Sequence, residues 1–263
     1  MSFVEAAGLR VRYEVSGPDG APVVVLSHSL GADLSMWDPQ VAALEKRLRV
    51  LRYDTRGHGG TTLARGPYSL EDLARDVLRL LDTLDVARAH FCGLSMGGMI
   101  GMWLGAHAAP RIDRLVLCNT GARIGTAEAW NARIQSVREG GMSVVAASVI
   151  ERWFTPEFQS TSPEVVAAAR TLLENTPPEG YAAACAALRD ADERSDLAAI
   201  AAPTLVIAGS RDPATPPAEG RALASGIPGA RYVELAASHL SNLEAEAAFT
   251  AELLGFLNGE RGD

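Results

Sequence analysis

Residues 89–107 read AHFCGLSMGGMIGMWLGAH and contain the pattern GxSxG at positions 93–97. The pattern follows a short apolar run at residues 89–92 and opens an apolar stretch at residues 96–107. This order predicts a strand, a tight turn and a helix. Glycines are expected on either side of Ser95 because a Cβ there would collide across so tight a turn. Ser95 would then stand at the helix N-terminus as a candidate nucleophile; the alternative is a helix-capping serine in a glycine-rich turn.

Strand and helix signals alternate on both sides of this motif. Ser69 and Asp72 have the spacing of a capping box, and the stretch after them has leucines at three- and four-residue intervals. The alternation predicts an α/β fold with a mostly parallel sheet covered by helices. The strands are predicted at residues 9–15, 23–27, 50–53, 90–92, 115–117, 204–208 and 232–235, and a closing helix at 243–257.

Residues 127–197 have a different pattern from the rest of the chain. They are rich in alanine, helical in period and interrupted at Gly140–Gly141, Pro156, Pro163 and Pro177–Pro178. Because strand signals return at residue 204, this block is interpreted as an insertion between two parts of one sheet. We therefore predict a helical cap at residues 123–197 and a core made of residues 1–122 and 198–263.

A catalytic serine needs a histidine base, which follows the serine and the acid in chains with this elbow. Two histidines, His107 and His239, lie downstream of Ser95. His107 falls about three turns along the helix that Ser95 would open, so it cannot reach back. His239 follows the last predicted strand and is the candidate base, the alternative being an ordinary surface-loop histidine.

The acid is sought between Ser95 and His239. Asp212 directly follows the predicted strand at residues 204–208 and is the preferred candidate. Asp190, Asp192 and Asp196 lie in a charged segment typical of a solvated face. Asn119 carries an amide, which cannot stabilise an imidazolium as a carboxylate would.

An oxyanion formed at Ser95 would need two backbone donors. Met96 follows the serine directly, and its N–H is the first predicted donor. The second is expected in the loop after the strand at residues 23–27, and Leu30 is the candidate. His28 and His58 are interpreted as structural loop residues.

Composition excludes several classes of function. The net charge is −8 and no run of Lys or Arg forms a basic footprint, so nucleic-acid binding is not expected. Lys46 is the only lysine, which argues against Schiff-base chemistry, and no GxxxxGK[ST] phosphate loop occurs. No stretch of the chain approaches a membrane span. Three cysteines without a CxxC and no signal-peptide pattern predict a reduced, cytoplasmic setting.

Together these residues resemble the α/β-hydrolase family, and the resemblance extends over nearly the whole chain. More narrowly, the chain is similar to the 3-oxoadipate enol-lactonases of bacterial aromatic degradation (the β-ketoadipate pathway). The stretches that carry the likeness are SHSLGADLSMWDPQ (27–40), YDTRGHG (53–59), GLSMGGMIGMWL (93–104), WNARIQSVREGGM (130–142) and ERWFTPEF (151–158).

This resemblance implies hydrolysis of an anionic enol-lactone by a Ser95–Asp212–His239 triad through an acyl-enzyme, without metal or organic cofactor. The substrate carboxylate must meet a cation. Trp130 and Arg133 are three residues apart and would share one helix face. Arg133 is expected to grip the carboxylate and Trp130 to donate its indole N–H; the alternatives are a surface arginine and a core tryptophan.

Other functions remain open from the sequence. On the same scaffold these are another carboxylesterase, a hydrolase of carbon–carbon bonds or a haloperoxidase-like enzyme. A non-catalytic ligand receptor is the alternative of a different class, although the intact serine, acid and histidine favour an enzyme. No pattern in the sequence indicates the oligomeric state.

Overall fold

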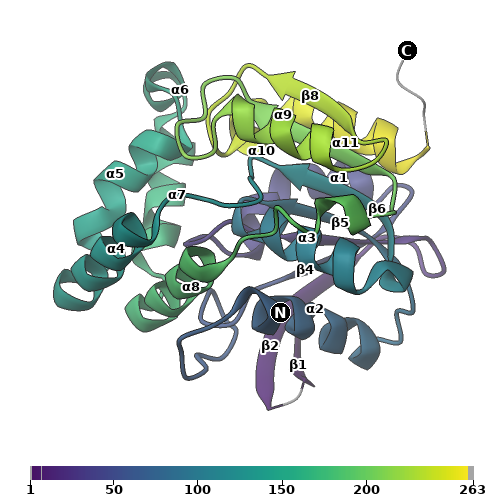
Figure 1. The fold of residues 1–263 in the computed structure, drawn as a ribbon, viewed down its shortest axis with the longest axis horizontal. Helices are drawn as coiled ribbons and strands as arrows, with labels where there is room; N and C mark the ends of the chain where they lie inside the picture. The colour runs from purple at the N-terminus through teal and green to yellow at the C-terminus, as the bar shows by residue number, and fades with distance from the viewer. Residues whose placement is uncertain (1, 7, 260–263) are drawn as a thin grey trace.

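The computed structural model describes residues 2–6 and 8–259, which form one twisted sheet flanked by helices (Figure 1). Within these residues the sheet has eight strands in the order β1-β2-β4-β3-β5-β6-β7-β8. The pairs β1–β2 and β2–β4 are antiparallel, and from β4 to β8 all neighbours are parallel. The strands are β1 (Ser2–Ala6), β2 (Leu9–Ser16), β3 (Val23–Ser27), β4 (Arg49–Tyr53), β5 (Ala89–Leu94), β6 (Ile112–Cys118), β7 (Thr204–Gly209) and β8 (Arg231–Leu235).

Helices cover the sheet and bury its central strands. Every residue of β5 and β7 is buried, as expected for parallel strands with helices on both faces. Helix α3 packs on β5 and β6 and against α2, while α1 packs against α11. The predicted α/β architecture is therefore confirmed. The core helices are α1 (Asp38–Leu44), α2 (Leu70–Thr83), α3 (Met96–His107), α9 (Pro217–Gly226), α10 (Ser241–Glu244) and α11 (Glu246–Leu257), with 3-10 turns η1 (Leu34–Trp37), η2 (Ala109–Arg111) and η3 (Leu197–Ala199).

A group of helices between β6 and β7 lies to one side of the sheet, at the left in Figure 1. Its boundaries follow local chemistry. Gly141, at φ 73°, caps the first of these helices, and Pro156, Pro163 and Pro178 each stand at a first helical position. The predicted breaks are thus real helix ends. The helices are α4 (Ala127–Gly140), α5 (Ser143–Trp153), α6 (Pro156–Thr161), α7 (Pro163–Glu174) and α8 (Pro178–Asp190).

The capping box of α2 forms as predicted. The Ser69 hydroxyl accepts from the Asp72 N–H at 3.1 Å, and the Asp72 carboxylate accepts from the Ser69 N–H at 2.9 Å. Val77, Leu80 and Leu81 are fully buried on the inner face of the helix. Local capping and the apolar stripe therefore support the same helix.

The structure also differs from the expectations at the two ends of the chain. The N-terminal strand β1 was not predicted; it adds to the sheet by pairing with β2. The single helix expected at residues 243–257 is two helices, α10 and α11, which meet at Ala245. No helix in the described part of the chain is long and apolar enough to cross a bilayer.

We expect Leu80→Ala to lower the free energy of unfolding by about 2–5 kcal/mol, because it removes a fully buried side chain from α2 and leaves a cavity. Urea denaturation measures this loss. Leu63, which is 48% exposed, gives the matched control, and Leu63→Ala should change stability by less than about 0.5 kcal/mol. Equal losses in the two variants would contradict this account of the core.

Candidate active site

Ser95 occupies the turn between β5 and α3, where its backbone is strained. Its φ and ψ angles are 57° and −112°, a conformation that non-glycine residues rarely adopt. A Cβ on Gly93 would lie 2.1 Å from the Gly97 oxygen, and a Cβ on Gly97 would lie 2.2 Å from the Ser27 oxygen. Both glycines are therefore required because the turn and the start of α3 press against neighbouring backbone.

Hydrogen bonds from the adjacent strand hold this turn. The Ser95 N–H donates to the backbone carbonyl oxygen of Cys118 at 2.9 Å. The backbone carbonyl oxygen of Ser95 accepts from the Met99 N–H at 3.0 Å. The Thr120 hydroxyl also donates to this backbone carbonyl of Ser95, at 2.8 Å. The β6 strand and the loop after it thus fix the serine backbone from two sides.

His239 and Asp212 form a buried pair. Nδ1 of His239 lies 2.8 Å from Oδ2 of Asp212, and each residue is only 3% exposed. Asp212 follows β7 and His239 follows β8, so the two side chains meet because adjacent parallel strands end at the same edge of the sheet. Ser95 and His239 line one cavity. The three residues selected from the sequence are therefore gathered in one place.

The Asp212 carboxylate is held in its ionised form. Its Oδ1 accepts from the N–H groups of Ala214 (2.8 Å) and Thr215 (3.0 Å). Its Oδ2 accepts from the Thr215 hydroxyl (2.7 Å) and the Asn119 amide (3.0 Å). Burial by itself would raise the pKa of Asp212, but the charge of His239 and these hydrogen bonds outweigh it and leave that pKa below its ordinary value.

Two backbone N–H groups near Ser95 have no acceptor in the described part of the chain. Met96 is the first residue of α3, so its N–H has no acceptor within the helix. Leu30 lines the cavity, and its N–H has no protein acceptor among the residues that the structure describes. The two positions predicted as oxyanion donors thus lie beside the serine with unpaired donors.

The cavity beside Ser95 and His239 has a volume of about 260 Å³ and a positive lining. Arg133 of α4 and Arg152 of α5 line it, whereas no Asp or Glu does so among the described residues. Within that same part of the chain, neither guanidinium has a carboxylate partner within 4.0 Å. The Arg152 side chain donates instead to the uncharged backbone carbonyl of Ser148, at 3.0 Å. Burial, followed by the charge of Arg133, lowers the pKa of Arg152.

Trp130 lines the cavity, but its polar atom is already engaged. The indole N–H donates to the Ile124 oxygen at 2.6 Å, so the expectation that it donates to the substrate is wrong. A backbone carbonyl at the start of the helical segment satisfies it, and the ring serves as a wall. The Arg133 guanidinium lies over this ring, 5.2 Å from its centroid.

Comparison with known proteins identifies the family of this chain. The model of the alpha/beta hydrolase fold family matches residues 22–246 of the chain. The chain belongs to the α/β-hydrolase family. This hydrolase is 43% identical to the 3-oxoadipate enol-lactonase 2 of Acinetobacter baylyi over 93% of its own length and 91% of the relative's. It is 42% identical to 3-oxoadipate enol-lactonase 1 of the same organism, over 95% and 94% of the two chains.

A solved structure is similar over almost the whole of this hydrolase. The crystal structure of the enol-lactonase from Burkholderia xenovorans LB400 superposes with a TM-score of 0.97 at 50% sequence identity. The match covers 98% of this chain and 100% of that one. The expected α/β-hydrolase fold, with helices between β6 and β7, is therefore confirmed.

Sequence reasoning missed three side chains at the site of this α/β hydrolase. The sequence does not indicate that Arg152 belongs to the site, because it lies on a different helix from Arg133. Only the fold places both side chains in one cavity. Thr215 comes three residues after Asp212, a spacing at which an aspartate often accepts hydrogen bonds in a turn, so its contact with Asp212 was open to prediction. The sequence presents Asn119 only as a substitute for the acid, whereas its side-chain N–H donates to Asp212 and its side-chain carbonyl accepts from the Ser241 hydroxyl at 2.5 Å.

Three of the other four histidines, His28, His58 and His107, have other partners. His28 and His58 are buried and their rings lie 5.3 Å apart, which agrees with their interpretation as loop residues. Burial lowers the pKa of both rings, and the charge of His28 lowers that of His58 further, to about 3. His107 lies at the far end of α3, where Nε2 is 3.2 Å from Asp196 Oδ2. None of the three lines the cavity of Ser95.

The depressed pKa of Asp212 predicts a pH-dependent contribution to stability. Between the folded and unfolded pKa values of this group the unfolded chain binds more protons, so stability rises with pH. The contribution is complete above the unfolded pKa, about 3.9, and is lost as the pH falls through the lower folded value. We expect the free energy of unfolding of the wild type to fall toward that of Asp212→Asn below about pH 4.

Urea denaturation at several pH values from about 6 to 3 measures this difference. Asp19→Asn is the control, because the Asp19 side chain is 99% exposed and its ion pair with Arg49, at 4.0 Å, is exposed to solvent. Exposed ion pairs contribute little to stability, so the difference between this variant and the wild type should change much less with pH. A constant difference for Asp212→Asn would contradict the assignment.

Proposed function

We propose that this protein hydrolyses 3-oxoadipate enol-lactone to 3-oxoadipate, with Ser95, His239 and Asp212 as a catalytic triad. Its relatives named as enol-lactonases cover nearly the whole chain and support an ester or lactone hydrolase. The substrate is a small lactone bearing a carboxylate. No metal or organic cofactor takes part in the proposed reaction.

The observation that carries the proposal is the charge of the cavity. The whole chain has a net charge of −8, which disfavours an anion approaching the protein. Yet Arg133 and Arg152 bring two guanidinium groups to the cavity of Ser95 without carboxylate partners in the described part of the chain. Uncompensated cations in a partly desolvated site favour binding of an anionic group. A substrate carboxylate supplies that group.

We assign the helices α4–α8 the role of a cap over the triad. Residues 123–197 would form this cap, and residues 1–122 and 198–263 the core. Support comes from the lining of the cavity: the core contributes Ser95 and His239, whereas the helical segment contributes Trp130, Arg133 and Arg152. The core would supply the reacting groups and the cap would select the substrate.

In the first half of the proposed reaction, His239 takes the Ser95 proton and the serine oxygen attacks the ring carbonyl. The Leu30 and Met96 N–H groups donate to the oxyanion, each contributing about 3 kcal/mol. The ring ester bond then breaks, and its oxygen leaves as an enol that takes the proton from His239. Asp212 stays ionised and stabilises the imidazolium. The enol becomes a ketone, so the alcohol that would close the ring again is lost.

In the second half, a water molecule attacks the acyl group on Ser95. His239 takes a proton from the water and returns it to the serine oxygen as the acyl bond breaks. The product leaves as 3-oxoadipate with two carboxylates, after the newly formed carboxylic acid has released its proton to the solvent. The neutral serine and neutral imidazole are restored, and the reaction has consumed one lactone and one water.

Ser95→Ala tests the substrate and the nucleophile together. We expect the wild type to accelerate the loss of ultraviolet absorbance of freshly prepared 3-oxoadipate enol-lactone, and the variant to fall to residual activity at least about 1000-fold lower. The spontaneous opening of the lactone is subtracted in each run. Lactone turnover retained by the variant would refute the nucleophile. Absence of turnover by a wild type that still cleaves a neutral aryl ester would refute the substrate.

Arg133→Ala and Arg152→Ala test the recognition of the carboxylate. Each should lower kcat/KM for the lactone about 10- to 100-fold, mainly through KM, because a charge-assisted hydrogen bond is lost. Hydrolysis of a neutral aryl ester should stay within about twofold of wild type. Arg138→Ala is the matched control, since Arg138 also lies on α4 but pairs with Glu179 away from this cavity. Equal losses on both substrates would contradict anion recognition.

A further inference from the structure

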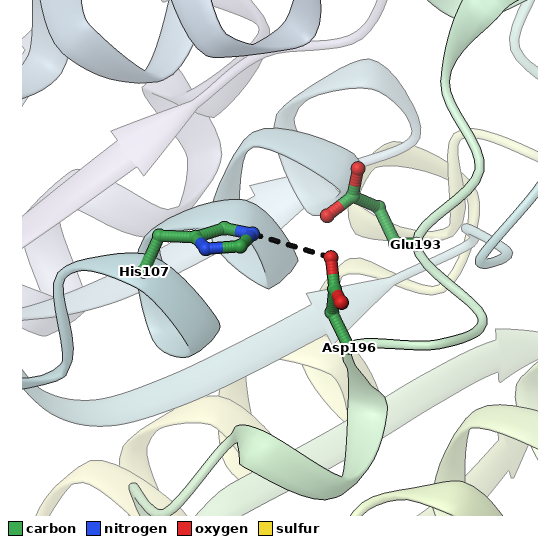
Figure 2. Close-up of side chains that lie close together, drawn as sticks. All are labelled: His107, Glu193 and Asp196. Atoms are coloured by element: carbon green, nitrogen blue, oxygen red, sulfur yellow. Dashed lines mark hydrogen bonds and ion pairs between the residues drawn. The ribbon is translucent and has the colours of Figure 1, made fainter.

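A second cluster of polar side chains lies at the opposite end of α3 from Ser95. His107 is the last residue of that helix, and Glu193 and Asp196 lie in the connection between α8 and η3. Figure 2 shows the imidazole and the two carboxylates converging from these two segments. One donor atom from each of the three residues lies within 4.8 Å of the other two, and Nε2 of His107 is 3.2 Å from Oδ2 of Asp196.

Glu193 lacks the partner that a buried carboxylate requires. The residue is 7% exposed, and its Oε2 atom is buried with no hydrogen-bond partner in the described part of the chain. Burying a carboxylate without a hydrogen bond or a counter-charge is costly. The cluster is therefore short of positive charge at Glu193.

We propose that His107, Glu193 and Asp196 bind one divalent first-row transition-metal ion, with Zn²⁺ as the representative. An imidazole with two carboxylates is a ligand set that such ions accept, and the open positions would be filled by water. The ion would supply the charge that Glu193 lacks.

The distances are compatible with this coordination. Donor atoms around a tetrahedral ion with bonds of about 2.0–2.1 Å lie about 3.4 Å apart. The donor atoms here all lie within 4.8 Å of one another, so no distance between them must shrink by more than about 1.4 Å. The side chains of His107 and Asp196 are 43% and 35% exposed, so they have room to make that adjustment. Glu193 can remain in its buried position.

Neighbouring contacts already hold the donor residues in place. The Trp103 ring lies 4.9 Å from that of His107, one turn earlier on α3. The Glu193 N–H donates to the Ala122 oxygen at 2.8 Å, and the Asp196 N–H donates to the Glu193 oxygen at 3.0 Å. A site whose backbone is already positioned by hydrogen bonds loses less entropy when it binds an ion, while the exposed side chains can still adjust.

The ion would join two parts of the fold. Ala122 precedes α4 and Glu193 follows α8, so their hydrogen bond brings together the chain segments that enter and leave the helices α4–α8. Coordination by His107 would tie this junction to the end of α3. The proposed role of the site is to stabilise the junction, and it is independent of the reaction proposed for Ser95.

Calorimetric titration of metal-free protein with ZnCl₂ tests the site. We expect the wild type to bind one equivalent, and His107→Asn and Glu193→Gln each to bind about 100-fold more weakly. Asp113→Asn is the matched control, because Asp113 forms a His–carboxylate pair of the same 3.2 Å separation with His90 but belongs to no three-residue group in the described chain. This variant should bind like wild type. Co²⁺ should produce visible absorption bands in the wild type and in Asp113→Asn, the two proteins expected to bind the ion.

Thermal unfolding provides the second readout. At a Zn²⁺ concentration about 100 times the Kd, the midpoint of wild type and Asp113→Asn should rise by about 5 °C, and those of the two site variants should not. The unfolding midpoints without metal verify that each variant folds. If Glu193→Gln is unstable, His107→Asn still tests the site, because the His107 side chain is 43% exposed and its replacement should not disturb the core. Absence of saturable Zn²⁺ binding by the wild type, or equal binding by His107→Asn, would overturn the proposal.

Discussion

The close approach of α3 to the carbonyl end of β3 is the constraint on which the site depends. Gly97 allows it, since a Cβ there would lie 2.2 Å from the Ser27 oxygen. The approach forces Ser95 to a positive φ, at a cost of about 1–3 kcal/mol that the surrounding sheet and hydrogen bonds must offset. In return the side chain projects into the cavity at the N-terminus of a helix. The same helix ends at His107, so its placement also positions the proposed metal site.

Charge is distributed unevenly over this acidic protein. Asp212 is buried yet ionised, because the charge of His239 and four further hydrogen-bond donors stabilise its carboxylate. Arg133 and Arg152 face the cavity, and in the described chain neither guanidinium has a carboxylate within 4.0 Å. Glu193 shows the reverse case, a buried carboxylate without a donor on Oε2. Burial makes each imbalance energetically important, since solvent screens a buried charge poorly. These are the positions where we propose catalysis, substrate binding and metal binding.

Several features followed from the sequence because their causes are local. The glycines around Ser95, the capping box at Ser69 and the prolines that begin helices act within a few residues, so short patterns reveal them. Asp212 and His239 are far apart in the chain, but each directly follows a predicted strand. Because parallel strands end at a common edge, this pattern was enough to predict that the two would meet.

The partners of individual polar atoms were decided only by the tertiary structure. The sequence could place Trp130 and Arg133 on one helix face, but not show that the indole N–H is taken by the Ile124 oxygen. It likewise could not place Arg152 in the same cavity or leave Glu193 Oε2 without a partner beside His107. The physical reason is the distance along the chain over which each interaction acts. Backbone conformation responds to near neighbours in the sequence. A hydrogen bond or ion pair between distant residues depends on atoms that only the completed fold brings within about 3 Å.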